Sequence, residues 1–162
     1  MTPSRPPRLD APATRRAVKA VSRINAVLYR ATDGRLGGRL PANRDRPHGV
    51  PVCLLTTRGR KTGRLRTAPL LYLGLEDGSV AVVASQGGMD RHPMWYRNLL
   101  QEPRAVLQTG ADLSLRRART AGPEERERLW PRLVALYPRY ADYQSWTERE
   151  IPVVLLEEPG RA

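Results

Sequence analysis

The sequence predicts one mainly β domain, a small antiparallel barrel with flanking helices. Six short apolar runs with strand-like composition lie between residues 50 and 157. Turn signals at hairpin spacing separate most of these runs, and segments with helical periodicity lie near both ends of the chain. A length of 162 residues is that of a single domain with a buried core.

The first third of the chain precedes the predicted barrel. A Pro- and Arg-rich start is expected to form a mobile arm. A helix is expected from Thr14, a candidate capping residue, to about Ala31, with a loop up to residue 49. The predicted organisation is an arm (1–13), a basic amphipathic helix and loop (14–49) and a barrel domain (50–162).

The predicted N-terminal helix is amphipathic and basic. Ala17, Ile24 and Leu28 recur at helical spacing. The basic residues of the helix are Arg15, Arg16, Lys19, Arg23 and Arg30. Two interpretations are open: the apolar face packs on the helix's own domain, or the helix lies on an anionic membrane surface.

The barrel region alternates strands with helices. Strands are expected at 50–57, 66–75, 79–85, 104–109, 112–120 and 151–157. Helices are expected at 93–101, from Pro123 up to Pro138, and at 139–147.

Positive charge is concentrated near the N-terminus. Residues 1–66 carry 16 Lys and Arg against three Asp, a net charge of +13 in a chain whose total is +12. Such asymmetry indicates an anionic partner: nucleic acid, an anionic membrane, or a polyanionic small molecule.

Other features exclude several classes of protein. One cysteine, Cys53, and two histidines predict neither a disulfide nor a metal site, and fit a reducing cytoplasm. The chain has no apolar run of membrane-spanning length, and its start lacks the apolar region of a secretory signal.

The first candidate binding segment is the turn at 58–64, which has four cations and two glycines. Arg and Lys at such a turn suit phosphate or carboxylate. It is not a Walker A loop, because Arg60 precedes Lys61 where that motif needs glycine. A solvated hairpin tip is the alternative.

Two further segments could form a ligand pocket. Ser85 ends a predicted strand before two glycines, so backbone amides could line a pocket there. Tyr137, Tyr140 and Tyr143 follow at a spacing of three, in a chain with no phenylalanine. They could line an aromatic slot and donate hydrogen bonds, or form a core stripe. No protein nucleophile is evident, which favours a cofactor that carries the chemistry.

These segments resemble the deazaflavin-dependent nitroreductase and F420H2-dependent quinone reductase family, which uses coenzyme F420. The matching segments are SRIN…LYR…DG…LGG (22–38), LLTTRGRKTG (54–63), VVASQGG (82–88), HPMWYRNL (92–99) and ERLWPRLVALYPRYADYQSWTEREIPVV (127–154). The resemblance implies a split β-barrel of the flavin-reductase or pyridoxamine-phosphate-oxidase type. It also implies bound F420, whose deazaflavin ring carries a phosphate and an oligoglutamate tail.

The resemblance also assigns site residues. Arg60, Lys61 and Thr62 would hold the phosphate or the tail. The rest of the cofactor groove would be lined by Arg66, Thr67, Ala68, Pro69, Leu70, Leu71, Val83, Ala84, Ser85, Gln86, Met94, Trp95, Tyr96, Arg97, Asn98 and Tyr140. Tyr140, Ser85, Tyr137 and Tyr143 would face the substrate as the catalytic set.

The implied reaction is hydride transfer from C5 of reduced F420 to a quinone or nitroaromatic acceptor. Leu71 stands where the nitroreductase has an aromatic residue, and Gln86 where it has lysine. The alternatives are an FMN-binding split-barrel oxidoreductase and a nucleic-acid-binding protein. The tyrosines lie outside the basic segment, which disfavours the second. The protein is expected in the cytoplasm, at the inner face of the membrane if residues 14–31 bind it. No metal or oligomeric state is predicted.

Overall fold

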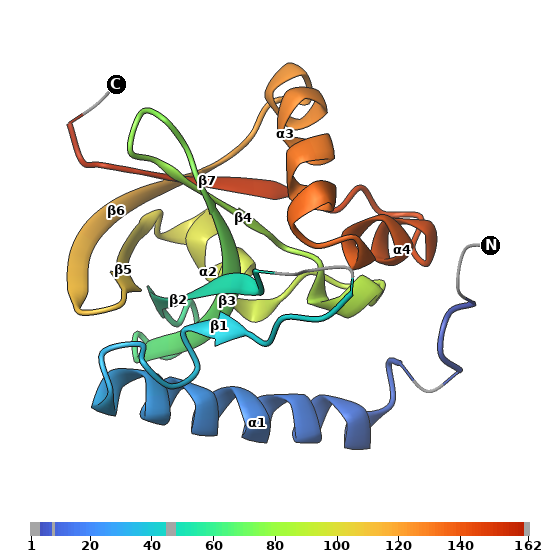
Figure 1. Ribbon diagram of the computed structural model, residues 1–162, viewed down its shortest axis with the longest axis horizontal. Coiled ribbons are helices and arrows are strands. Elements are labelled where there is room, and N and C mark those ends of the chain that lie inside the picture. The colour runs from blue at the N-terminus through green and yellow to red at the C-terminus, as the bar shows by residue number, and fades with distance from the viewer. Residues whose placement is uncertain (1–3, 8, 45–47, 161–162) are drawn as a thin grey trace.

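The computed structural model describes residues 4–7, 9–44 and 48–160, which form a closed antiparallel sheet with helices on its outside (Figure 1). The strands are β1 (Arg39–Leu40), β2 (Val50–Arg58), β3 (Leu65–Gly74), β4 (Val80–Val83), β5 (Arg104–Thr109), β6 (Asp112–Thr120) and β7 (Val153–Glu157). Their order is β1-β2-β3-β4-β7-β6-β5, and β2 also pairs with β5. This last pairing closes β2 to β7 into a six-stranded barrel, which confirms the predicted fold class.

The helices lie on two sides of the barrel. They are α1 (Pro12–Ala31), the 3-10 turn η1 (Gln86–Gly88), α2 (Met94–Gln101), α3 (Pro123–Leu136) and α4 (Arg139–Ser145). In Figure 1, α1 runs along one side, while α3 and α4 lie at the opposite side. Among the described helices, none is long and apolar enough to cross a membrane.

Among the differences between predicted and observed element boundaries, those at α1, β1 and β4 have a clear cause in the structure. The helix α1 begins at Pro12, with Ala11 as N-cap and no side-chain cap bond, so the expected cap at Thr14 is wrong. The expected loop contains β1, whose two residues pair with the start of β2. The strand β4 ends at Val83, because Ser85 is helical and Gln86 has a positive φ of 49°.

The barrel core is filled from one end by α2. Trp95, Tyr96 and Leu99 are buried and pack with inward side chains of the strands. The Tyr96 hydroxyl hydrogen-bonds the Thr120 hydroxyl at 2.9 Å. The resemblance assigned Trp95 and Tyr96 to the cofactor groove, and the structure buries both in the barrel core.

One edge of β3 lacks a strand partner over most of its length. The strand pairs with β2 from Leu65 to Leu71. On its other side it pairs with β4 only over Tyr72, Leu73 and Gly74. No described strand therefore bonds the second edge of β3 over residues 65–71, which we call the open edge. Beyond β4 the chain leaves the sheet at Ser85, so the barrel splits at this point.

The helix α1 turns its apolar face away from the domain. Tyr29 fixes the helix: its buried hydroxyl donates to the Val52 carbonyl at 3.0 Å and accepts from the Gly110 amide at 2.8 Å. The exposed fractions of Val21, Ile24 and Val27 are 66%, 61% and 67%. The prediction that the helix packs on its own domain is confirmed, but it does so through Ala26 and Tyr29, while the apolar residues Ile24 and Leu28 point outward.

Candidate functional site

Three tyrosines form one cluster at the junction of α3 and α4. Helix α3 ends at Leu136, and Pro138 starts the next helix, so the chain turns between Tyr137 and Tyr140. The Tyr140 ring centroid lies 5.1 Å from that of Tyr137 and 6.3 Å from that of Tyr143. The structure thus brings together the tyrosines that the sequence singled out.

Tyr140 is the most enclosed of the three. Its side chain is 4% exposed, and burial raises the pKa of its hydroxyl well above the ordinary tyrosine value. Burial and the hydrogen bond to Tyr137 also raise the pKa of Tyr143; their hydroxyls lie 3.3 Å apart. No described residue hydrogen-bonds the Tyr140 hydroxyl. Tyr140 is therefore protonated at neutral pH and can donate to a ligand.

The segment after β4 packs directly against α4. Gln86, Gly87 and Gly88 all have positive φ, at 49°, 64° and 81°. A Cβ on Gly88 would lie 3.1 Å from the Tyr143 carbonyl oxygen and 3.0 Å from the Trp146 ring. Only glycine permits this approach, which brings the buried Ser85 into the neighbourhood of α4.

Leu71 joins β3 to the tyrosine cluster. Its half-buried side chain packs against the cluster that contains Tyr140 and also against the one that contains Tyr29 of α1. It lies at the end of the open edge, so that end adjoins the core cluster to which Tyr140 belongs.

The cationic turn lies at the other end of the open edge. The Gly59 amide donates to the Arg64 carbonyl at 2.8 Å, and the Gly63 amide donates to the Gly59 carbonyl at 2.7 Å. Within the described part of the chain, Arg60, Lys61 and Arg64 make no ion pair. The Arg60 Nε is buried and has no partner there. Its donor capacity thus remains for a ligand.

Asn98 of α2 hydrogen-bonds the backbone of the cationic turn and the strand residue that precedes it. Its side-chain oxygen accepts from the Arg60 amide at 3.1 Å, and its nitrogen donates to the Thr57 hydroxyl at 3.1 Å. The residue is 3% exposed. The role that the structure shows for Asn98 is therefore to position the turn, a role the sequence did not indicate.

The remaining predicted groove residues divide between surface and core. Met94 and Arg97 are exposed, as is Arg66. Thr67 is engaged by Arg30, whose guanidinium donates to its hydroxyl at 2.6 Å. Side chains that pack into the two core clusters are Ala68, Leu70, Val83, Ala84, Trp95 and Tyr96. Pro69 is half-buried, and Thr62 is exposed at the turn.

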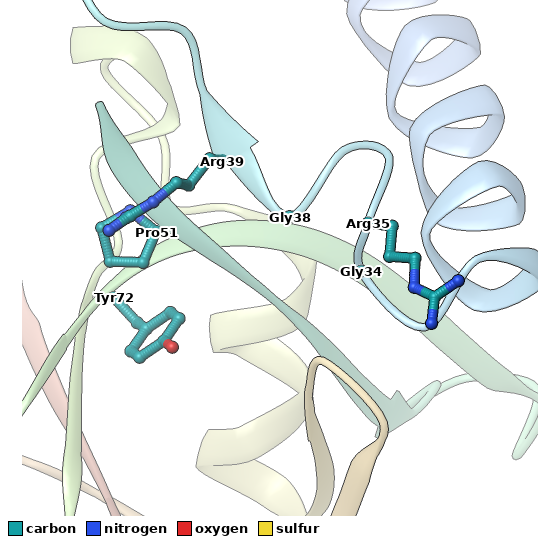
Figure 2. Close-up of a pocket in the computed structure, with 6 residues that line it drawn as sticks. All are labelled: Gly34, Arg35, Gly38, Arg39, Pro51 and Tyr72. Carbon is teal, nitrogen blue, oxygen red and sulfur yellow. The ribbon is translucent and has the colours of Figure 1, made fainter. Parts of the chain in front are cut away.

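A separate pocket holds none of the predicted site residues. It is lined by Gly34, Arg35, Gly38, Arg39, Pro51 and Tyr72 and has a volume of ≈ 330 Å³ (Figure 2). Arg39 and Pro51 lie near the start of β2, whereas the cationic turn follows its end. The open edge, not this pocket, connects the predicted segments.

Known proteins resemble this chain over most of its length. The family model for F420H(2)-dependent quinone reductases matches residues 21–158. A Mycobacterium tuberculosis protein described as an F420H(2)-dependent quinone reductase is 38% identical over 138 residues, 83% of this chain and 87% of its own. A second, putative one from that organism is 48% identical over 107 residues, 66% of this chain and 89% of its own.

Solved structures show the same relationship. A structure described as an F420-H2 dependent reductase (FDR-A) is 44% identical and superposes with a TM-score of 0.61, over 66% of this chain and 94% of that one. Another, described as a domain-swapped dimer, is 38% identical with a TM-score of 0.63, over 83% of this chain and 94% of that one. The chain belongs to the F420H2-dependent quinone reductase family.

Proposed function

We propose that this protein transfers a hydride from F420H2 to a quinone. The observation that carries the proposal is the open edge of β3, which leads from the cationic turn to the tyrosine cluster. Leu65 and Leu71 are six residues apart, about 20 Å in a strand. That span suits one elongated ligand with an anionic tail at the turn and a ring beside the tyrosines.

The residues at the turn fit the anionic part of F420. Exposed Lys61 and the unpartnered Nε of Arg60 supply charge and directed donors, and the Thr62 hydroxyl lies between the two glycines. Phosphate and carboxylate are the ligands that such groups bind. These three residues would hold the phosphate or tail, and bound F420H2 would supply the hydride.

Tyr140 would act on the acceptor. When a quinone accepts a hydride, negative charge develops on one of its oxygens. A protonated hydroxyl in an enclosed site stabilises that charge. One such donor contributes about 3 kcal/mol. The Ser85 hydroxyl oxygen already accepts weakly from the Gly87 amide at 3.4 Å, which leaves its own proton available. We propose Ser85 as a second donor, with Tyr137 and Tyr143 as the walls.

The range of acceptors depends on Leu71, the half-buried residue at the end of the open edge. Leu71 is shorter than an aromatic residue and cannot stack on a small nitroaromatic ring. We therefore propose quinones as the main acceptors and nitroaromatics as poorer ones.

Titration of the purified protein with F420, and separately with FMN, tests the cofactor. Menadione is then added to the protein with F420H2. The proposal predicts tight F420 binding, weaker FMN binding and menadione-dependent oxidation of F420H2. Binding without oxidation would overturn the reductase function, and absence of F420 binding would return FMN or nucleic acid to consideration.

We also propose that α1 lies on an anionic membrane surface. Its outward face carries Val21, Ile24 and Val27, and the same helix carries five basic and no acidic residues. Apolar side chains would enter the headgroup region while the cations bind anionic lipid. A second copy of this helix would bring like charges together, which disfavours pairing. Such attachment at the inner face of the membrane would place the enzyme where quinones reside.

Vesicle sedimentation tests this attachment. Wild-type protein is predicted to sediment with vesicles of phosphatidylglycerol and not with phosphatidylcholine. The variant I24E/V27E changes only exposed positions and should remain in the supernatant. Equal sedimentation of both proteins would contradict the proposal. A change from dimer to monomer in gel filtration would instead assign the face to a second copy.

A further inference from the structure

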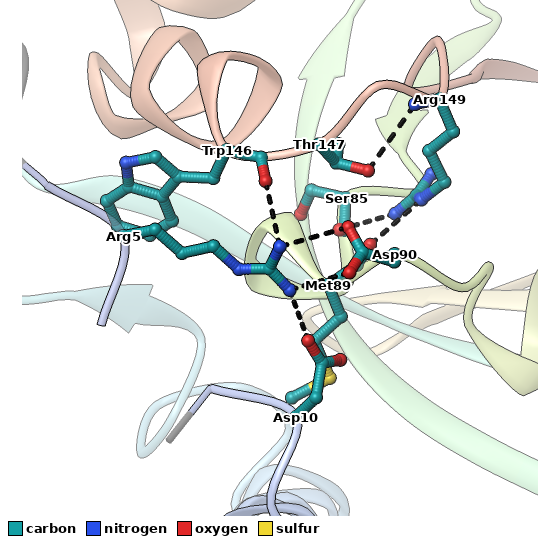
Figure 3. A network of polar contacts seen from close by, with 8 residues as sticks. All are labelled: Arg5, Asp10, Ser85, Met89, Asp90, Trp146, Thr147 and Arg149. Atoms are coloured by element: carbon teal, nitrogen blue, oxygen red, sulfur yellow. Dashed lines mark hydrogen bonds and ion pairs between the residues drawn. The ribbon is translucent and has the colours of Figure 1, made fainter. Parts of the chain in front are cut away.

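One arginine binds both ends of the segment 84–89. Arg149 lies between α4 and β7 and donates from Nε to the Met89 carbonyl at 2.9 Å and from Nη2 to the Ser85 carbonyl at 2.8 Å (Figure 3). Both of its Nη atoms lie 3.3 Å from the Ala84 carbonyl oxygen. A single forked guanidinium thus holds three carbonyls of one loop.

Arg149 differs from the paired arginines of the molecule. Arg119, for example, binds the carboxylates of Glu125 and Glu157. Within the described residues, no carboxylate forms a salt bridge with Arg149, although the Asp90 carboxylate is close enough to act on it electrostatically. The remaining hydrogen-bond partner of its guanidinium is the His92 Nδ1, at 3.2 Å. Its hydrogen-bonding capacity is therefore directed at the backbone of one loop.

The orientation of each of these carbonyls fixes the orientation of the N–H group in the same peptide unit. In a trans peptide, the C=O and N–H groups point in opposite directions. With the carbonyls of Ala84 and Ser85 turned to Arg149, the N–H groups of Ser85 and Gln86 point away from it. The Ala84 amide donates to the Pro152 carbonyl at 2.9 Å, on the β7 side. Strand β4 lies between β7 and β3 in the sheet, so amides that point away from Arg149 and β7 face the side of the open edge.

The local backbone makes these two amides a concave donor site. Ser85 has helical angles, φ −73° and ψ −34°, and Gln86 follows with a left-handed φ of 49°. Successive amides in this alternation converge on one point and bind anionic oxygens. A non-glycine residue with this φ is strained and needs its surroundings to hold it. Arg149 bonds the Ser85 carbonyl, in the peptide group directly before Gln86.

We propose that Arg149 is a positioning residue that keeps the amides of Ser85 and Gln86 aimed at an electron-rich oxygen of the bound ligands. This inference rests on the proposed function, because that function places a ligand at the open edge. The oxygen has two possible sources, a carbonyl of the deazaflavin ring or the reacting oxygen of the quinone, and the experiment below distinguishes them.

The test compares R149A and R149K with a matched control, R126A. Arg126 is also half-buried and also binds a backbone carbonyl, that of Ile151, at 3.1 Å, together with the Gln144 side chain. It does not contact the 84–89 loop. Each variant is examined by amide NMR spectra without ligand, by thermal unfolding, by F420 titration, and by menadione kinetics with saturating F420H2.

The proposal predicts that R149A shifts the amide resonances of Ser85 and Gln86, while R126A leaves them in place. F420 binding that weakens about tenfold in R149A identifies a cofactor oxygen as the ligand. Unchanged F420 binding with a loss of about tenfold or more in kcat/KM for menadione identifies the acceptor oxygen. R149K is predicted to share the loss, because an ammonium cannot bind three carbonyls as a fork does. Added methylguanidinium should recover part of the loss in R149A.

Equal effects of R149A and R126A on binding and kinetics would overturn the proposal, as would unchanged Ser85 and Gln86 resonances in R149A. If R149A does not fold, R149K decides the same comparison. Failure of the wild-type protein to bind F420 would remove the proposed function, while the resonances of the ligand-free protein would still decide whether Arg149 holds the loop.

Discussion

The two ends of the open edge differ in exposure and in how their side chains are held. At the cationic turn the charged side chains are mostly exposed, and backbone hydrogen bonds between Gly59, Gly63 and Arg64 shape the turn. At the other end the buried Tyr140 ring lies beside the rings of Tyr137, Tyr143 and Trp130, in a core cluster against which Leu71 packs. Charges at the turn act through water and are weakened by salt. A donor in the enclosed cluster acts at low local dielectric, where it is stronger. The first end therefore suits affinity and the second suits chemistry.

The largest effect is expected from Tyr140→Phe. Loss of the hydroxyl should lower kcat for menadione about 100-fold, because a donor worth about 3 kcal/mol is removed from the acceptor oxygen. F420 affinity and thermal stability should stay unchanged, since no described residue bonds this hydroxyl. Tyr96→Phe is the control: it removes the bond to Thr120 in the core and should lower stability without lowering kcat. Full turnover in Tyr140→Phe would remove the catalytic role.

The double variant R60A/K61A tests the turn. F420 binding should weaken about tenfold, and the remaining affinity should depend less on ionic strength, because screened surface charges have been removed. Fluorescence titration at low and high salt measures both. Arg117→Ala removes an exposed cation from β6 and should change neither. Loss of kcat at saturating F420H2 in R60A/K61A would contradict the division between the two ends.

The variant Asn98→Ala tests whether the shape of the cationic turn, in addition to its charge, contributes to F420 binding. The substitution leaves the Arg60 amide without its partner, and an unsatisfied buried donor costs about 1–3 kcal/mol. We expect a lower unfolding temperature and severalfold weaker F420 binding, with kcat unchanged at saturation. Asn98→Asp keeps the acceptor for Arg60 and should bind better than Asn98→Ala. Equal binding by the two variants would show that this hydrogen bond does not position the turn.

The smallest effect concerns pH. Burial, followed by the charges of Arg149 and Arg97, lowers the pKa of His92 below its ordinary value of 6.5. Below that value the unfolded chain binds the proton first, so the free energy of unfolding decreases as pH falls towards the lower folded pKa. Urea unfolding at about pH 7.5 and about pH 5.5 should show this decrease, and His92→Gln should reduce it. An identical decrease in the variant would exclude His92 as its source.

The sequence predicted those features that depend on local pattern. Strands β5 and β6 have the expected bounds because alternating residues and a glycine turn define them. The tyrosine cluster follows from its spacing, together with the break at Pro138. These features need no knowledge of distant partners.

The remaining features depend on tertiary partners and could not be read from local pattern. The outward apolar face of α1 results from Tyr29, whose hydroxyl bonds Val52 of β2 and Gly110 of the turn between β5 and β6. The open edge of β3 results from the point at which β4 leaves the sheet. Asn98 and Arg149 hydrogen-bond backbone groups that are distant in sequence, and no residue pattern predicts such bonds. Arg149 even stands between Glu148 and Glu150 in the sequence, so the local pattern indicates an ion pair rather than bonds to a distant loop.

The central claim is that one ligand spans the open edge from the turn to the tyrosines. Hydrogen exchange of the protein with and without F420 tests it most directly. We predict that F420 slows exchange in residues 59–71 and in residues 84–88 together. Slowed exchange only around Arg35 and Arg39 would place the ligand in the separate pocket and contradict the claim.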